Sequence, residues 1–231
     1  MALDTYCLNG DLAALRAYCA RANVTAEQVR KSHALQLACR GGHLEVARWL
    51  QQTFQLTAAD DNSALCWACR NGHLEVARWL QQVFQLTAAD ARAYDNCALR
   101  WACMNGHLEV ARWLQRTFQL TEADVRATDN WVLRMACMGG YLEVARWLQE
   151  TFQLTALDAR ADGNFALHWA CVHGHLDVVN WLHQTFQLTA ADVRSEHNWV
   201  VQETYANKHT EVLRWLQHTW GIQPPAHTPS A

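Results

Sequence analysis

One ten-residue string constrains the fold of this chain most, because it returns along almost the whole length. The string GHLEVARWLQ, or an altered copy of it, begins at Gly10, Gly42, Gly72, Gly106, Gly140, Gly174 and Lys208. By subtraction of these positions, the steps are 32, 30, 34, 34, 34 and 34 residues. Such a period is typical of repeat architectures whose units stack on one another. We therefore expect one solenoid over residues 1–220 and a flexible C-terminal tail over residues 221–231.

Each copy is predicted to form two helices. The first, as in CALRWACMNG, ends at a glycine, which commonly terminates helices. It is preceded in successive copies by a residue suited to N-capping: Ser32, Asn62, Asn96, Asn130, Asn164 and Asn198. The second helix, as over residues 107–118, places Leu108, Ala111 and Leu114 on one side at helical spacing. The copies therefore predict stacked helix pairs.

A connector, FQLTAADVR or a variant, follows each second helix. Its threonine precedes an aspartate by three residues at Thr87, Thr121, Thr155 and Thr189. This spacing is related to the capping box, in which two residues satisfy free amides at a helix start. We therefore predict a short third helix in the connector.

Composition excludes several classes of protein. The formal net charge is −3 and the pI about 6.4, which is unlike the basic surface of a nucleic-acid binder. No apolar run approaches the ~18 residues of a membrane span, and the N-terminus lacks the features of a secretory signal. Nine cysteines in such a chain indicate a reducing compartment, the cytoplasm, rather than a disulfide framework. Five of them recur in register, at Cys39, Cys69, Cys103, Cys137 and Cys171, as small buried hydrophobes would.

The segment NCALRWACMNGHLEVARWLQ resembles the ankyrin repeat, whose usual pattern is TPLHxA followed by xxGHLEVVxLLL. TPLH is absent here, and FQLTAAD stands where an ankyrin hairpin would begin. In those two features the chain resembles the divergent ankyrin repeats of giant DNA viruses and their protist hosts. The resemblance implies an all-α solenoid of about seven helix-pair repeats, with short connector helices in place of some or all β-hairpins. It also implies a protein-binding scaffold. Tetratricopeptide repeats share the period, but their tryptophan, glycine and tyrosine placement and their proline are missing.

Differences among the copies indicate which surface binds. On the first helix, Leu99, Ala102, Cys103 and their equivalents hardly change, which predicts a core side. A second stripe at spacing i, i+3, i+7 changes from copy to copy: His33/Gln36/Arg40, Ser63/Cys66/Arg70, Cys97/Arg100/Met104, Trp131/Arg134/Met138, Phe165/His168/Val172 and Trp199/Gln202/Ala206. Aromatic residues, Arg and Met are enriched at protein interfaces. The predicted protein-binding residues are Arg100, Met104, Trp131, Arg134, Met138, Phe165, His168 and Trp199. The alternative is that the three aromatic residues pack on the connector helix and that the variation is neutral.

Candidate chemical sites are weak. Cys66 and Cys69 form a CxxC, but Cys69 belongs to the periodic core series and no redox fold surrounds it. His168, His173 and His183 lie near Cys171, yet they do not converge as zinc ligands must. His175 belongs to the recurring Gly-His pair and is expected to bond backbone at its helix start. No catalytic or nucleotide-binding motif is present. We therefore expect no enzyme, no metal and no cofactor.

The leading hypothesis is a scaffold or adaptor that holds a partner protein along a concave face and is monomeric by itself. No nucleic-acid or membrane partner is expected. The alternative is a structural component that self-associates or packs into a larger assembly such as a virion.

Overall fold

The computed structural model describes residues 2–57, 63–194 and 199–223. Within these ranges the regular elements are helices and no strand forms, so the predicted all-α repeat fold is confirmed. Contacts divide the chain into two compact units, Met1–Leu120 and Thr121–Ala231. Most of the predicted tail, residues 224–231, lies outside the described residues, as do Asn62 and Asn198.

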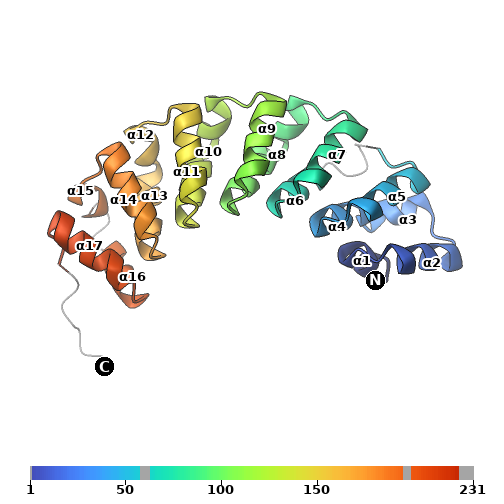
Figure 1. Cartoon of the computed structure of the whole chain (residues 1–231), viewed down its shortest axis with the longest axis horizontal. Helices are drawn as coiled ribbons and strands as arrows, with labels where there is room; N and C mark the ends of the chain where they lie inside the picture. The colour runs from blue at the N-terminus through green and yellow to red at the C-terminus, as the bar shows by residue number, and fades with distance from the viewer. Residues whose placement is uncertain (1, 58–62, 195–198, 224–231) are drawn as a thin grey trace. The chain divides into compact units, whose positions relative to one another are not determined.

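The first unit stacks the first helices α1, α4, α6 and α8 in order, and each of them pairs with the second helix that follows it (Figure 1). A connector helix, α3, precedes α4. The bounds are α1 (Ala2–Asn9), α2 (Leu12–Ala22), α3 (Ala26–Lys31), α4 (Ala34–Gly41), α5 (Leu44–Phe54), α6 (Ala64–Arg70), α7 (Leu74–Phe84), α8 (Ala88–Met104) and α9 (Leu108–Phe118).

The second unit repeats this plan with α10, α13 and α16 as stacked first helices. Short connector helices precede α13 and α16. The bounds are α10 (Glu122–Met138), α11 (Leu142–Phe152), α12 (Ala156–Ala159), α13 (Ala161–Val172), α14 (Leu176–Phe186), α15 (Ala190–Arg194), α16 (Trp199–Ala206) and α17 (Thr210–Trp220).

The core of each layer consists of the residues that the copies share. Leu99, Ala102 and Cys103 on α8 are completely buried, as predicted, and so are their counterparts on α13. On α9, Ala111 and Leu114 are buried while Leu108 is half-buried. One repeat cannot cover this apolar surface alone, so burial requires the stack.

The periodic tryptophans of the second helices contact the phenylalanine that ends the same helix. The two rings meet edge to face with centroids 5.6 Å apart at Trp113 and Phe118. The same contact recurs at Trp49–Phe54, Trp79–Phe84, Trp147–Phe152 and Trp181–Phe186. Such an arrangement is favourable for aromatic quadrupoles. It explains why tryptophan and FQL recur together.

The predicted connector helices form, with the threonine cap expected of them. The backbone amide of Thr87 and its hydroxyl both donate to Asp90 Oδ2, at 2.7 Å each. Thr121, Thr155 and Thr189 make the same pair of bonds to Asp124, Asp158 and Asp192. Part of the prediction needs correction, because the connector and first helix of α8 and of α10 run on as one element with a kink between them.

The predicted asparagine N-caps are wrong where the structure describes them. Asn96, Asn130 and Asn164 lie at the kinks, with φ of 57°, 56° and 66°, and are buried. Ser32 ends α3 instead, and its hydroxyl donates to the carbonyl of Val29. Asparagine tolerates the left-handed region better than most residues do, and that conformation is what the kink requires.

The histidine of the Gly-His pair contacts the layer before it, at His43, His73, His107 and His175, and not its own helix start as expected. His73 Nε2 lies 3.1 Å from the carbonyl oxygen of Arg40, and its ring covers Gly42. A Cβ on Gly42, whose φ is +76°, would lie 2.6 Å from that ring. The histidine of the next layer therefore fills the space that a side chain at this glycine would occupy.

Candidate protein-binding surface

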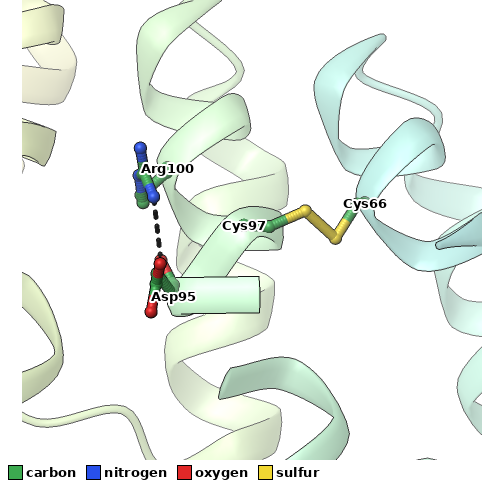
Figure 2. The surroundings of a disulfide bond; sticks show 4 residues. All are labelled: Cys66, Asp95, Cys97 and Arg100. Atoms are coloured by element: carbon green, nitrogen blue, oxygen red, sulfur yellow. Dashed lines mark hydrogen bonds between the residues drawn. A yellow bond between two sulfur atoms is a disulfide. The ribbon is translucent and has the colours of Figure 1, made fainter. Parts of the chain in front are cut away.

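The variable stripe of the first helices turns out to be paired across layers. Its second position in one layer meets its first position in the next. Cys66 on α6 is joined to Cys97 on α8 by a disulfide (Figure 2). In the second unit, the Arg134 guanidinium lies 4.9 Å from the centre of the Phe165 ring, and the His168 ring lies 6.0 Å from that of Trp199.

This pairing changes the predicted binding site. Arg134 and His168 are only 7% and 3% exposed, so they cannot touch a partner from their present positions. Arg134 is further held by an ion pair with Asp162, and His168 Nε2 lies 2.8 Å from the carbonyl oxygen of Asp192. Burial lowers the pKa of Arg134 from its usual value, and the nearby Asp129 charge only partly offsets this. Both residues support the stripe from beneath.

The other predicted residues are half-buried. In the first unit these are Arg100 and Met104; in the second they are Trp131, Met138, Phe165 and Trp199. Arg100 Nη1 donates to the backbone carbonyl of Asp95 at 3.4 Å, which holds its side chain along α8 (Figure 2). Each of the six still offers surface to a partner. The alternative was that the three aromatic residues pack on the connector helix. For Phe165 and Trp199, the observed contacts are instead with a neighbouring first helix.

A continuous group of rings lies between α13 and α16. Trp169, which is not among the residues predicted from the sequence, is its centre, with ring centroids 5.5 Å from Phe165 and 5.8 Å from Trp199. The His173 ring also contacts Trp169, tilted against it with centroids 5.3 Å apart. We call Phe165, Trp169, His173 and Trp199 the aromatic cluster. Trp169 recurs in register with Trp67 and Trp101, so it does not stand out among the positions that vary from copy to copy.

The first unit has a different feature on the same helices, which we call the Arg–Trp row: Arg40, Trp67, Arg70 and Trp101. The Arg40 and Arg70 guanidinium groups each lie 5.0 Å from the centre of the Trp67 ring, and Arg70 also lies 4.1 Å from that of Trp101. These are cation–π distances. Arg40 is exposed, whereas the other three are half-buried.

Charge distinguishes the Arg–Trp row from the second helices. There, Arg48, Arg78 and Arg112 each pair with a glutamate three residues earlier. Among the described residues, by contrast, no carboxylate lies within ion-pair distance of Arg40 or Arg70. A guanidinium stacked on a ring keeps its N–H groups in its own plane, where a carboxylate can accept from them.

The sequence indicates a reducing compartment rather than a disulfide framework, and in the structure one disulfide forms while seven cysteines are free. Cys66 pairs with a cysteine of the next repeat and not with Cys69 of the CxxC, which is buried in the core. In the part of the chain that is described, no group of three His, Cys, Asp or Glu side chains is arranged to hold a metal ion. His173 Nδ1 instead lies 3.0 Å from the carbonyl oxygen of Trp169.

Comparisons with known proteins agree with the repeat. A family model for ankyrin repeats (three copies) matches residues 3–90, 56–129 and 117–197. A search of curated proteins gives no match. Over the described ranges, no helix is both long enough and apolar enough to cross a bilayer.

Proposed function

Because the chain belongs to the ankyrin-repeat family, we propose that it is a scaffold that binds a partner protein on the first-helix face of its repeats. Ankyrin repeats generally mediate protein–protein interaction and are generally not enzymes. The observation that carries the proposal is the aromatic cluster, in which His173 is exposed, the other three rings are half-exposed, and the rings hold one another in place. This face is the one that the family resemblance implies to be concave.

Fixed aromatic rings are well suited to anchor a partner. Large rings dominate the binding energy of protein interfaces, and a side chain already ordered loses little entropy on binding. Phe165 and Trp199 each have two ring or cation contacts that hold them in place. We assign direct contact to Phe165, Trp199, Trp131 and Met138 in the second unit, with Arg134 and His168 as their supports.

The first unit indicates the chemistry of the partner. The Arg–Trp row presents cations next to apolar rings, and within the described ranges these cations have no carboxylate partner. An acidic segment of a partner protein would supply carboxylates to Arg40 and Arg70 while its apolar atoms cover the rings. We therefore propose that an acidic segment binds here, with Arg100 and Met104 at the edge of its path.

Affinity capture from the source cell tests the aromatic anchor. The variant Phe165→Ser, Trp199→Ser carries at both sites the residue that Ser63 supplies at the same repeat position. The matched control is Leu157→Ser, which removes an apolar side chain that is 82% exposed on α12. A specific partner should be captured at least tenfold less by the double variant and equally by the control, with both variants folded by circular dichroism. Equal capture by all three forms would show that the cluster is not the anchor.

A decaglutamate peptide tests the proposed acidic partner. Its binding should weaken as salt is raised, because exposed charges are screened. It should fall several-fold in Arg40→Gln, Arg70→Gln and remain in the control Arg48→Gln, whose cation is already paired. Equal binding by the two variants would contradict a site at the Arg–Trp row.

The rival hypothesis, a structural component of a larger assembly such as a virion, makes a different prediction. A scaffold should sediment as a monomer at all concentrations, whereas an assembly component should self-associate as concentration rises. The divergent repeat pattern supports a giant-virus or protist source, and with it a cytoplasmic location, as part of this proposal.

A further inference from the structure

The bond between Cys66 and Cys97 links first helices of adjacent repeats that are 31 residues apart in the sequence. Their Cα atoms are 5.7 Å apart, a usual separation for bridged cysteines. Figure 2 shows the bridge lying between α6 and α8, with Arg100 farther along α8. Cys66 immediately precedes Trp67, so the bridge lies next to the Arg–Trp row.

The other seven cysteines are poorly suited to thiol chemistry. They are buried: Cys7, Cys19, Cys39, Cys69, Cys103, Cys137 and Cys171. Burial, with smaller contributions from Cys19 and Asp4, raises the pKa of Cys7 to about 12, and burial raises that of Cys171 to about 12. A thiol that stays protonated is a weak nucleophile. Cys97, by contrast, is half-buried, so an attacking thiolate can reach it.

We propose that the Cys66–Cys97 bridge is a redox-modification site, opened and closed by exchange with small thiols of the glutathione class. Closing it fixes the spacing of Trp67 and Trp101, and with it the Arg–Trp row. This second step rests on the proposed function, whereas the bridge chemistry does not.

The exchange balances without a metal or an enzyme. In opening, the thiolate of a small thiol attacks Cys97 Sγ, the Cys66–Cys97 bond breaks and Cys66 leaves as a thiolate that takes up a proton. A second small thiol attacks the mixed disulfide and releases Cys97. The two electrons go to the protein cysteines, and the small thiols leave joined as one disulfide. Closing is the reverse, with that small disulfide as the oxidant.

Opening the bridge should loosen the contact between α6 and α8. The bond holds the two sulfurs closer than unbonded thiols can lie, and it shortens the loops available to the unfolded chain. Trp67 and Trp101 are carried by these two helices, and Arg70 contacts both rings. A change in the distance between the helices therefore changes the geometry offered to a carboxylate.

Alkylation of the denatured chain without reductant tests the bond. The intact chain has nine cysteines, so seven should react, and mass spectrometry should find a peptide pair that joins Cys66 to Cys97. In reduced glutathione all nine should react, and the pair should return after transfer to oxidised glutathione. Reaction of all nine in the oxidised chain, or glutathione attached to Cys97 in place of the bridge, would overturn the proposal.

Thermal unfolding separates this bridge from general effects of reductant. Reduction should lower the melting temperature by roughly 5–10 °C. The variants Cys66→Gln and Cys97→Ser carry the residues found at Gln36 and Ser63, the same repeat positions, and should not respond to reductant. The control Cys19→Ala should keep the full response. If reductant still lowered the melting temperature of Cys97→Ser, the effect would come from a group other than the Cys66–Cys97 bridge.

Decaglutamate binding tests the second step. Oxidised and reduced chains should differ several-fold in affinity, and Cys97→Ser should bind identically in both conditions. If neither form binds the peptide, the acidic-partner proposal fails while the alkylation and melting results still decide the bridge. If both forms bind it equally, the bridge does not control the row.

Discussion

Arg160 Nε and Nη2 donate to the two carboxylate oxygens of Asp192, at 2.7 and 3.2 Å, across 32 residues. Arg126 binds Asp158 in the same way one layer earlier. Each aspartate is also the cap of its connector helix. Burial alone would raise the pKa of Asp192, but the hydrogen bonds from Arg160 and Thr189 outweigh it and hold that pKa below its usual value.

Removing one of these carboxylates should therefore break two contacts. Asp192→Ala should lower the free energy of unfolding by roughly 2–4 kcal/mol, because it removes the cap and leaves Arg160 without its partner. In Asp90→Ala only the cap of Thr87 is lost, since no arginine bond to Asp90 is present among the described residues. That control should cost about 1 kcal/mol. Urea unfolding measures both, and equal losses would contradict an interlayer role.

The Gly-His contact predicts that a single methyl group added at the glycine strongly lowers the free energy of unfolding. In Gly140→Ala the new Cβ would lie 2.5 Å from the His175 ring, at a φ of +73°. The loss should be roughly 2–4 kcal/mol. Gly221 also has a positive φ, +64°, but nothing lies within 4 Å of its Cβ position. Gly221→Ala should therefore cost only about 1 kcal/mol, and a comparable loss in both variants would exclude steric conflict with His175.

Acid should weaken the stack through the same histidines. Burial lowers the pKa of His73 and His175 in the folded chain, although the backbone carbonyl contact of each opposes this. Because their pKa values lie below 6.5 when folded, their stabilisation is complete above 6.5 and is lost as pH falls from 6.5 through the lower folded pKa values. The urea midpoint should decrease between pH 7.5 and 5.5. Tyr141 stands at the same repeat position as these histidines. Replacing both histidines with tyrosine should reduce the decrease in the urea midpoint, and an unchanged decrease would show that other groups cause it.

The contact between Arg134 and Phe165 should appear as a coupling energy. A double-mutant cycle with Arg134→Met and Phe165→Leu should give about 0.5–2 kcal/mol, the range for a desolvated cation–π pair. The control cycle replaces Arg134→Met by Arg146→Met, an exposed residue of α11, and should give a coupling near zero. Coupling energies of the same size in both cycles would mean that the coupling does not come from the contact between Arg134 and the Phe165 ring.

The features that depend on one helix at a time could be predicted from the sequence. The repeat located the helix pairs, and the Thr-to-Asp spacing located the connector helices with their caps. The buried side of the first helix followed from Leu99, Ala102 and Cys103, because a constant residue at helical spacing usually faces the stack. The asparagines were misassigned because capping and a left-handed turn favour the same residue.

Contacts between layers were beyond the sequence. Periodicity places Arg134 on a face of its own helix, but it does not say that this face meets Phe165 of the next one. Cys66 and Cys97 stand at different positions of their repeats, so a search for residues in register does not bring them together. Trp169 was missed because it recurs in register with Trp67 and Trp101, whereas the binding residues were predicted from positions that vary among the copies.

The Gly-His contact also gives the stack a direction. His43, His73, His107 and His175 each contact a backbone carbonyl of the copy before them. At this contact, a copy therefore needs two things from its predecessor: a glycine and a backbone carbonyl oxygen. As far as this contact is concerned, a copy that offers both groups can be followed by any copy that carries the histidine. Genetic duplication or deletion of whole copies would then preserve this contact. A deletion that ends within a copy could leave a histidine without the glycine and the carbonyl that it contacts.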